Sequence, residues 1–158
     1  MDLAGRRILV VEDDYLLATE ICRDLRDLGA TVLGPAPTPF YALSLLGRRG
    51  VDGAVLDIRL HGTNVFEVAD ELAQRGTPMV FATSYGPEML PDRHRHRPLI
   101  TKPYDRKALL RVVHDLTGQP QPAPPATPAE IIHTPGGEGR HDRLMRAVAK
   151  SILQPLAV

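Results

Sequence analysis

The sequence contains one cysteine, Cys22, so it cannot form an internal disulfide bond. It has no apolar run near the ~20 residues that a bilayer-spanning helix requires, and its N-terminus is too short and too acidic for a signal peptide. We therefore expect a cytoplasmic protein that does not contact membranes. An excess of one charge is also absent, because nineteen Lys and Arg residues balance nineteen Asp and Glu residues. This balance argues against a dedicated nucleic-acid-binding protein.

Apolar residues make up 43% of the chain, enough for a core, and through the first 117 residues they follow two alternating patterns. Short branched apolar runs, typical of buried strands, alternate with segments whose apolar residues recur at helical spacing. The expected strands are 6–11, 31–34, 52–58, 78–83 and 97–102, and the expected helices are 15–28, 38–48, 65–74 and a last one after Asp105.

This alternation predicts an α/β fold with a doubly wound, flavodoxin-like parallel sheet of five strands in the order 2-1-3-4-5. Pro87 and Pro91 lie between the last two strands. Because proline interrupts helices, we expect the fourth helix there to be short or irregular. Within the run RHRHR at 93–97, we expect a solvated loop.

The composition changes at the end of the last expected helix. We assign 1–117 to the folded domain, 118–140 to a linker rich in proline and glycine, and 141–153 to a short amphipathic helix at the C-terminal end. Two interpretations of that helix stay open. It packs on its own domain or on a second copy of the chain, or it binds a downstream protein in a groove.

Residues with reactive side chains end four of the predicted strands. Glu12 and Asp13 end the first, Asp57 the third, Thr83 the fourth and Lys102 the fifth. In open parallel sheets these ends border the ligand-binding crevice, so we expect the three carboxylates to converge there. Carboxylates this close repel one another unless a cation lies between them, and oxygen ligands of this kind suit Mg²⁺. The lysine and the threonine hydroxyl fit the oxygens of a phosphoryl group, so the set predicts phosphoryl transfer onto a carboxylate.

The next acid, Asp14, stands where the first helix begins. We interpret it as the N-cap of that helix rather than as a metal ligand.

Four stretches occur in the order ILVVEDD (8–14), AVLDIRLHG (54–62), FATSYG (81–86) and ITKPY (100–104). Together they resemble the receiver domain of two-component response regulators, the domain of the chemotaxis regulators. The resemblance covers about residues 5–117 and implies a partner, either a sensor histidine kinase or a histidine phosphotransfer protein.

The resemblance also implies a role for each matching residue. Asp57 would accept the phosphoryl group, and Thr83 and Lys102 would contact it. The Mg²⁺ ligands would be Glu12, Asp13, Asp57 and the backbone carbonyl of Arg59, and Pro103 would follow a cis peptide bond. Such a domain is not an enzyme in the ordinary sense, although it assists its own phosphorylation and dephosphorylation.

The stretch FATSYG resembles, more narrowly, the Phe-Ala-Thr-Gly motif of a subgroup of single-domain alphaproteobacterial regulators. Ser84 stands where that motif has glycine. Receivers usually carry an aromatic residue on the fifth strand that turns inward with the threonine. Leu99 occupies that position here, and Tyr85 is the candidate for part of the missing role.

The leading hypothesis is a response regulator that acts by protein contact. About 40 residues follow the folded domain, too few for a helix-turn-helix domain with its own core. One alternative is a receiver-fold binding module that is not phosphorylated. Another is a Mg²⁺-dependent phosphatase of the haloacid dehalogenase type, but its nucleophile strand would carry a second aspartate where this chain has Arg59.

Overall fold

The computed structural model describes residues 1–118, and in this part of the chain five parallel strands form one sheet. The strand order is β2-β1-β3-β6-β7, which is the predicted order 2-1-3-4-5 with two short extra strands numbered between. The linker was predicted as 118–140, but its first residue, Gly118, is the last residue of a helix. Residues 119–140 of that linker and the predicted helix 141–153 lie outside the described residues. The sheet strands are β1 (Arg7–Val11), β2 (Thr31–Ala36), β3 (Gly53–Leu56), β6 (Met79–Thr83) and β7 (Leu99–Thr101).

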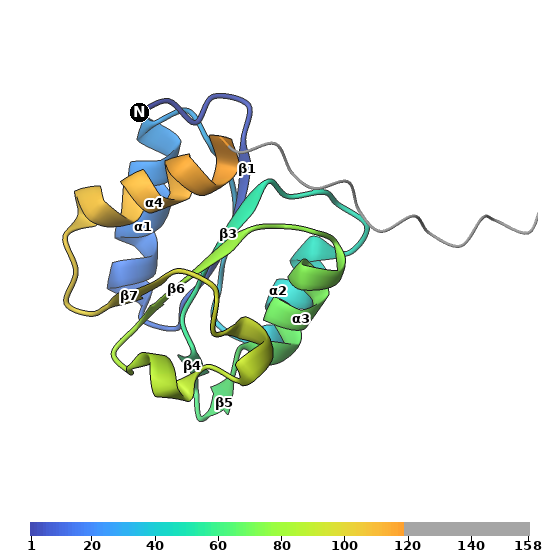
Figure 1. Cartoon of the computed structure of the whole chain (residues 1–158). Coiled ribbons are helices and arrows are strands. Elements are labelled where there is room, and N and C mark those ends of the chain that lie inside the picture. The colour runs from blue at the N-terminus through green and yellow to red at the C-terminus, as the bar shows by residue number, and fades with distance from the viewer. Residues whose placement is uncertain (119–158) are drawn as a thin grey trace, which may run out of the picture. The chain divides into compact units, whose positions relative to one another are not determined.

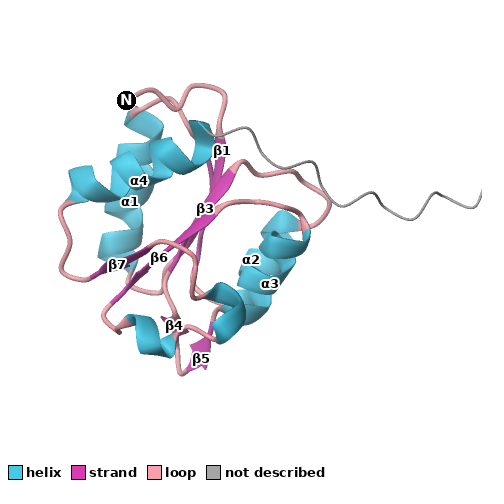
Figure 2. Ribbon diagram, in the orientation of Figure 1, coloured by secondary structure: helices cyan, strands magenta, loops and turns pink. Residues whose placement is uncertain are grey.

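Four α-helices cover the two faces of this sheet. Figure 1 shows α1 and α4 on one side and α2 and α3 on the other, and Figure 2 shows the strands between them. None of these helices is long and apolar enough to cross a bilayer. The helices are α1 (Tyr15–Asp27), α2 (Pro39–Leu46), α3 (Phe66–Gln74) and α4 (Arg106–Gly118).

The central strands β1, β3 and β6 are apolar apart from Arg7 at the start of β1 and Thr83 at the end of β6, because each of their faces is buried under a helix layer. Successive side chains of a strand point to opposite faces, so Leu9 belongs to the core under α2 and α3, and Val10 to the core under α1 and α4. Cys22 lies in the second core at 1% exposure, where it packs as a small apolar residue.

The helix starts follow from short polar side chains. Asp14 Oδ1 accepts a hydrogen bond from the backbone N–H of Leu17 at 3.0 Å, which confirms that Asp14 caps α1. Asp105 Oδ1 accepts one from the N–H of Lys107 at 2.9 Å at the start of α4. Both caps fix where the chain turns into a helix after leaving the end of a strand.

Strand β2 is longer than predicted, because it continues through Pro35 to Ala36. A proline within a strand is tolerated at a sheet edge, and β2 is an edge strand. The pairing register with β1 shifts at this point, and Gly34 adopts φ +111°, where a Cβ would lie 2.6 Å from the Val10 carbonyl oxygen. The proline and the glycine thus mark an irregularity in the strand and not its end.

The fourth helix is replaced by two single 3₁₀ turns, η1 (Pro87–Met89) and η2 (Asp92–His94), as the prolines predicted. The expectation of a fully solvated loop at 93–97 is wrong, because His94 is 2% exposed. Its ring contacts the rings of Phe66 and Phe81, at centroid distances of 6.5 and 6.0 Å, and those two rings also contact each other.

Candidate functional site

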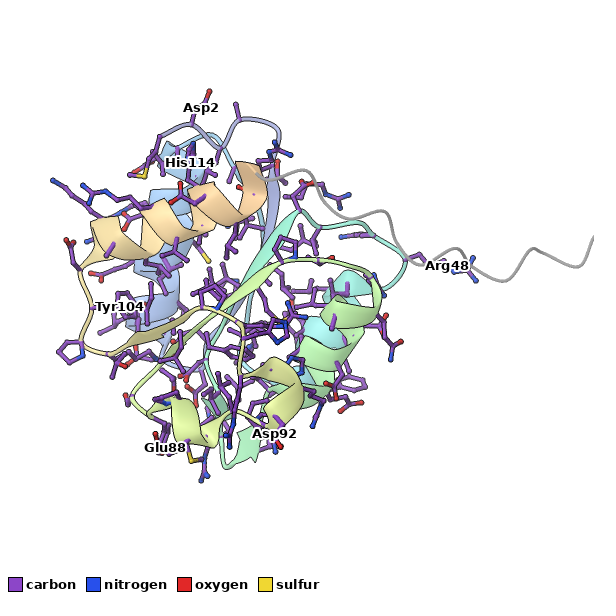
Figure 3. The ribbon with its side chains drawn as sticks, in the orientation of Figure 1. Asp2, Arg48, Glu88, Asp92, Tyr104 and His114 are labelled. Atoms are coloured by element: carbon purple, nitrogen blue, oxygen red, sulfur yellow. The ribbon has the colours of Figure 1, made fainter. Side chains whose placement is uncertain are left out.

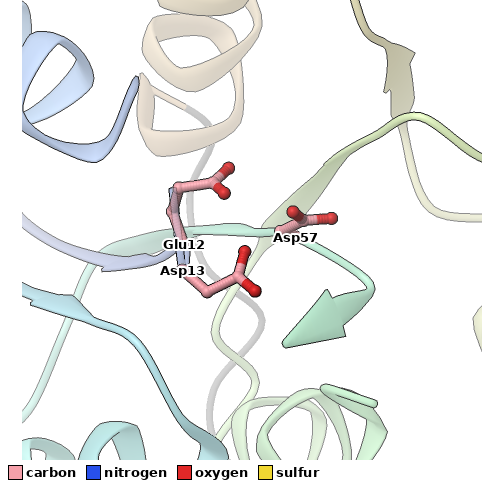
Figure 4. A group of neighbouring side chains, drawn as sticks. All are labelled: Glu12, Asp13 and Asp57. Atoms are coloured by element: carbon pink, nitrogen blue, oxygen red, sulfur yellow. The ribbon is translucent and has the colours of Figure 1, made fainter. Parts of the chain in front are cut away.

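The three acids singled out by the sequence meet at one edge of the sheet. Glu12 and Asp13 follow β1, and Asp57 follows β3. These strands are neighbours, with Val11 opposite Leu56, so their ends open on the same side. One carboxylate oxygen from each acid lies within 4.8 Å of the others. Figure 4 shows Glu12 and Asp13 at the end of one strand with Asp57 beside them at the end of the next.

Lys102 enters the same group from the end of β7. Its Nζ donates to Glu12 Oε2 at 2.7 Å and to Asp57 Oδ2 at 2.9 Å. Both acids are buried, at 4% and 7% exposure, so the ammonium group is a counter-ion in a region that water screens poorly. The Lys102–Pro103 peptide bond is cis, as the receiver resemblance implied.

Burial changes the pKa values of the ionisable groups in the site. Burial raises the pKa of Glu12 to about 7, although hydrogen bonds from Lys102 and from the backbone N–H of Asp14 oppose the rise. Burial lowers the pKa of Lys102, but its hydrogen bonds to Glu12 and Asp57 outweigh that effect and leave the pKa raised. Lys102 is therefore a cation at neutral pH, while Glu12 is an acid that a further cation would drive to its charged form.

A short hairpin beside the acids was not predicted. It consists of β4 (Arg59–Leu60) and β5 (Thr63–Asn64), joined by a two-residue turn. His61 and Gly62 adopt positive φ values of 46° and 81°, the pattern of a type I′ hairpin turn. The backbone N–H of His61 donates to Asp13 Oδ2 at 3.0 Å, so the turn holds the side chain of Asp13. The His-Gly pair was the sequence signal for this turn.

Thr83 lies at the end of β6 and is fully buried. Its backbone carbonyl accepts from the N–H of Lys102 at 2.8 Å, and its Oγ1 accepts from the N–H of Tyr85 at 3.3 Å. The ring of Tyr85, which is 40% exposed, lies 5.7 Å from the guanidinium carbon of Arg59. The threonine thus ends the expected strand, but its hydroxyl is engaged with Tyr85 and not with the carboxylates.

Two pockets border the acids and the lysine. One of about 260 Å³ is lined by residues that include Glu12, Asp13 and Pro37. Another of about 380 Å³ is lined by residues that include Lys102 and Tyr104, and Figure 3 shows Tyr104 on the loop before α4. The site is therefore open to solvent on two sides.

The donor set fits Mg²⁺. Hard oxygen ligands from carboxylates, with room left for water, are the environment that this ion prefers over softer metals. The three acids lie close enough to share one ion, and burial, which raises the pKa of Glu12, makes it a group whose charged form a bound cation would favour.

Comparison with solved structures identifies the fold family. SdrG from Sphingomonas melonis Fr1 is 33% identical, with a TM-score of 0.62 over 73% of this chain and 98% of SdrG. The non-phosphorylated HemR receiver domain from Leptospira biflexa is 28% identical, with a TM-score of 0.66 over 75% of this chain and 98% of the domain. The chain belongs to the response regulator receiver family. Receivers are typically non-enzymatic phosphoacceptors of histidine kinases, and the acidic cluster of this receiver is typical of their Mg²⁺ site.

A longer protein shares the same region. The transcriptional regulatory protein PdtaR of Mycobacterium tuberculosis is 28% identical over 91 residues, which are 57% of this chain and 44% of PdtaR. The match thus spans less than half of this curated relative. A scan against protein-family models found no match.

Proposed function

We propose that this receiver accepts a phosphoryl group on Asp57 from a sensor histidine kinase or a histidine phosphotransfer protein. The contact that supports this most directly is the bridge from Lys102 Nζ to Asp57 Oδ2 and Glu12 Oε2. A lysine that contacts the acceptor carboxylate before transfer is placed to bind a phosphoryl oxygen after it.

In the proposed reaction, one carboxylate oxygen of Asp57 attacks the phosphorus atom of a phosphohistidine. The new O–P bond forms as the P–N bond breaks, and the departing imidazole takes up a proton. Lys102 neutralises the charge that gathers on the transferred oxygens. The Thr83 hydroxyl, whose oxygen accepts from the Tyr85 N–H, donates its own proton to another of them. The same residues would stabilise the phosphoryl oxygens while a water molecule attacks the phosphorus atom, and the receiver would in this way assist its own dephosphorylation.

The metal of this proposal is Mg²⁺, held by Glu12, Asp13, Asp57 and the backbone carbonyl of Arg59. When bound, it supplies charge neutralisation for the phosphoryl oxygens. The acids contribute the ligand atoms, and the hydrogen bond from His61 to Asp13 keeps that carboxylate directed at the site.

We further propose that the receiver belongs to the Phe-Ala-Thr-Gly subgroup and that its output passes through protein contact. The stretch FATSYG supports the first part, and Leu99 in place of the usual aromatic is consistent with it. For the output, the sequence offers an apolar stripe within 141–153 as the contact segment. A pull-down with and without 119–158, at controlled phosphorylation state, tests whether this segment recruits a partner.

The phosphoryl acceptor is tested by intact mass after incubation with acetyl phosphate and Mg²⁺. We expect the mass of one phosphoryl group on the wild-type chain and none on Asp57→Asn. Asp115→Asn is the matched control, because Asp115 is an exposed carboxylate on α4 with 78% of its side chain accessible, and we expect it to behave as wild type.

No mass change in the wild type would refute the proposal. Mg²⁺ binding without phosphorylation would then favour the unphosphorylated binding module, and turnover of small phosphoesters would favour the phosphatase.

A further inference from the structure

The turn of the β4–β5 hairpin (Figure 2) carries a histidine beside the acids of the proposed metal site. His61 occupies the first of the two turn positions, and its backbone N–H donates to Asp13 Oδ2. Its side chain is 61% exposed, and its ring Nδ1 lies 3.8 Å from the same Asp13 oxygen. An imidazole therefore lies next to a carboxylate that belongs to the proposed Mg²⁺ ligands.

The turn itself does not require a histidine. A type I′ turn needs a residue that tolerates positive φ before the glycine, and Asn-Gly and Asp-Gly are the common pairs. Those shorter side chains would allow the same turn and the same backbone hydrogen bond to Asp13. The feature that His61 adds is its ring, which leaves the turn from a backbone with φ 46°.

The ring nitrogen nearest to Asp13 is available to a further group. A separation of 3.8 Å between Nδ1 and Oδ2 is too long for a hydrogen bond. Within residues 1–118 the ring of His61 forms no hydrogen bond with another residue either. A neutral imidazole has a lone pair on one ring nitrogen, so Nδ1 can bind a cation that Asp13 binds at the same time.

The distance between these two atoms is compatible with one shared ion. Zn²⁺ binds imidazole nitrogen and carboxylate oxygen at about 2.1 Å, so two ligand atoms of one Zn²⁺ ion lie at most about 4.2 Å apart. The Nδ1 to Oδ2 distance of 3.8 Å is within that limit. Because most of the ring is exposed, it can rotate toward a bound ion without displacing other side chains.

An imidazole ligand changes the ion that a site prefers. Carboxylate, carbonyl and water oxygens suit Mg²⁺, whereas imidazole nitrogen suits ions such as Zn²⁺ and Ni²⁺. Glu12, Asp13 and Asp57 offer oxygen atoms within 4.8 Å of one another. With His61 added, the site offers three oxygen ligands and one nitrogen ligand, which are enough for the four-coordinate geometry that Zn²⁺ commonly takes.

We infer that His61 is a further metal ligand, through which this site binds Zn²⁺ by one imidazole nitrogen and the carboxylates, more tightly than it binds Mg²⁺. This inference rests on the proposed function, because it uses the acids of the proposed Mg²⁺ site. It adds a second ion and a ligand that the Mg²⁺ site does not need. Since both ions use the same carboxylates, Zn²⁺ and Mg²⁺ should compete for the site.

The test measures the affinity of the full chain for Zn²⁺ and for Mg²⁺ by titration calorimetry at one pH. In His61→Asn, which tolerates positive φ and keeps the backbone N–H, we expect Zn²⁺ to bind at least about tenfold more weakly. Mg²⁺ should bind this variant within about twofold of the wild type, because Mg²⁺ gains little from an imidazole. In the wild type, Zn²⁺ should shift the imidazole NMR signals of His61, and excess Mg²⁺ should weaken the apparent binding of Zn²⁺.

His114→Asn is the matched control. His114 on α4 also places its Nδ1 near a carboxylate, 3.2 Å from Asp115 Oδ1, and its side chain is 41% exposed. This pair is separate from the three acids that could share an ion. We therefore expect His114→Asn to bind both ions at the site as the wild type does.

Four results would overturn the inference. If the wild type binds Zn²⁺ no more tightly than Mg²⁺, or if His61→Asn binds Zn²⁺ as tightly as His114→Asn, the imidazole is not a ligand and the acceptor site stands. If His61→Asn weakens the binding of both ions by the same factor, the residue only positions Asp13. If the wild type binds neither ion, the metal site of the proposed function fails and this inference fails with it.

Discussion

Replacing Lys102 with methionine removes the cation that separates two buried carboxylates. Its Nζ contacts both Glu12 and Asp57, and its side chain is 16% exposed. Breaking a buried ion pair from one side costs about 3–5 kcal/mol, and because some of this side chain reaches water we expect the lower end, about 3 kcal/mol, at about pH 8. With a slope near 1.5 kcal/mol per molar urea, the unfolding midpoint should fall by roughly 2 M.

The loss should depend on pH in a defined direction. The pKa of Glu12 is about 7 with Lys102 in place, against 4.5 in the unfolded chain, and loss of the nearby cation raises it further. A carboxyl group with a raised folded-state pKa favours the native state fully below its unfolded value, and this contribution is lost as pH rises through the folded value. Glu12 is protonated in both folded proteins below about pH 7, so the destabilisation by Lys102→Met should be smallest there and should grow as the pH rises above about 7.

Urea unfolding of the full chain, with and without excess MgCl₂, measures both effects. Since Mg²⁺ supplies the missing positive charge, Lys102→Met should gain more stability from it than the wild type does. As the control, Arg106→Met removes the cation of an exposed ion pair with Asp24, and we expect little or no loss of stability and no Mg²⁺ dependence. Equal Mg²⁺ stabilisation of wild type and Lys102→Met would refute the assignment of Lys102 as the counter-ion of the acids.

Three further predictions concern the frame of the site. Asp14→Ala should cost about 1 kcal/mol in urea unfolding through the lost cap of α1 and leave Mg²⁺ affinity unchanged; weaker Mg²⁺ binding would make Asp14 a ligand. Gly34→Ala should cost at least about 1 kcal/mol because its Cβ would meet a backbone oxygen at positive φ, whereas Gly50→Ala, with no neighbour in reach, should be neutral or slightly stabilising. Burial lowers the pKa of His94, with Asp70 opposing the effect and Arg97 adding to it, so the contribution of His94 to stability should fall as pH drops below 6.5; an NMR titration midpoint above 6.5 would contradict this.

Most of the fold was accessible from the sequence because buried parallel strands carry continuous apolar runs that few other elements produce. The end of β2 was not, since Gly34 and Pro35 are ordinary signs of a turn and only the edge position of the strand lets it continue. Local pattern identified the element, and tertiary position decided its length.

The site was predicted to the extent that it lies at strand ends. Glu12, Asp13, Asp57 and Lys102 meet because the sheet order brings their strands together, and that order followed from the alternation of elements. The burial of His94 could not be predicted, because His94 and His96 sit equally between arginines in an irregular segment with no periodicity. Its partner Asp70 lies 24 residues earlier, on a helix that only the folded chain brings near.

Three consecutive acids at the end of a core strand are stable together because each has a different donor. Glu12 is buried and bonded to Lys102, and Asp13 accepts from the backbone of His61. Asp14 turns outward to cap α1, where the positive end of the helix dipole favours its charge. Only the first two remain directed at Asp57, so the chain can place dense negative charge beside its core and still offer a cation two carboxylates from β1 and one from β3. Burial, with a smaller contribution from the charge of Asp57, raises the pKa of Glu12, and a bound cation that favours its charged form links metal binding to stability in the test of Lys102.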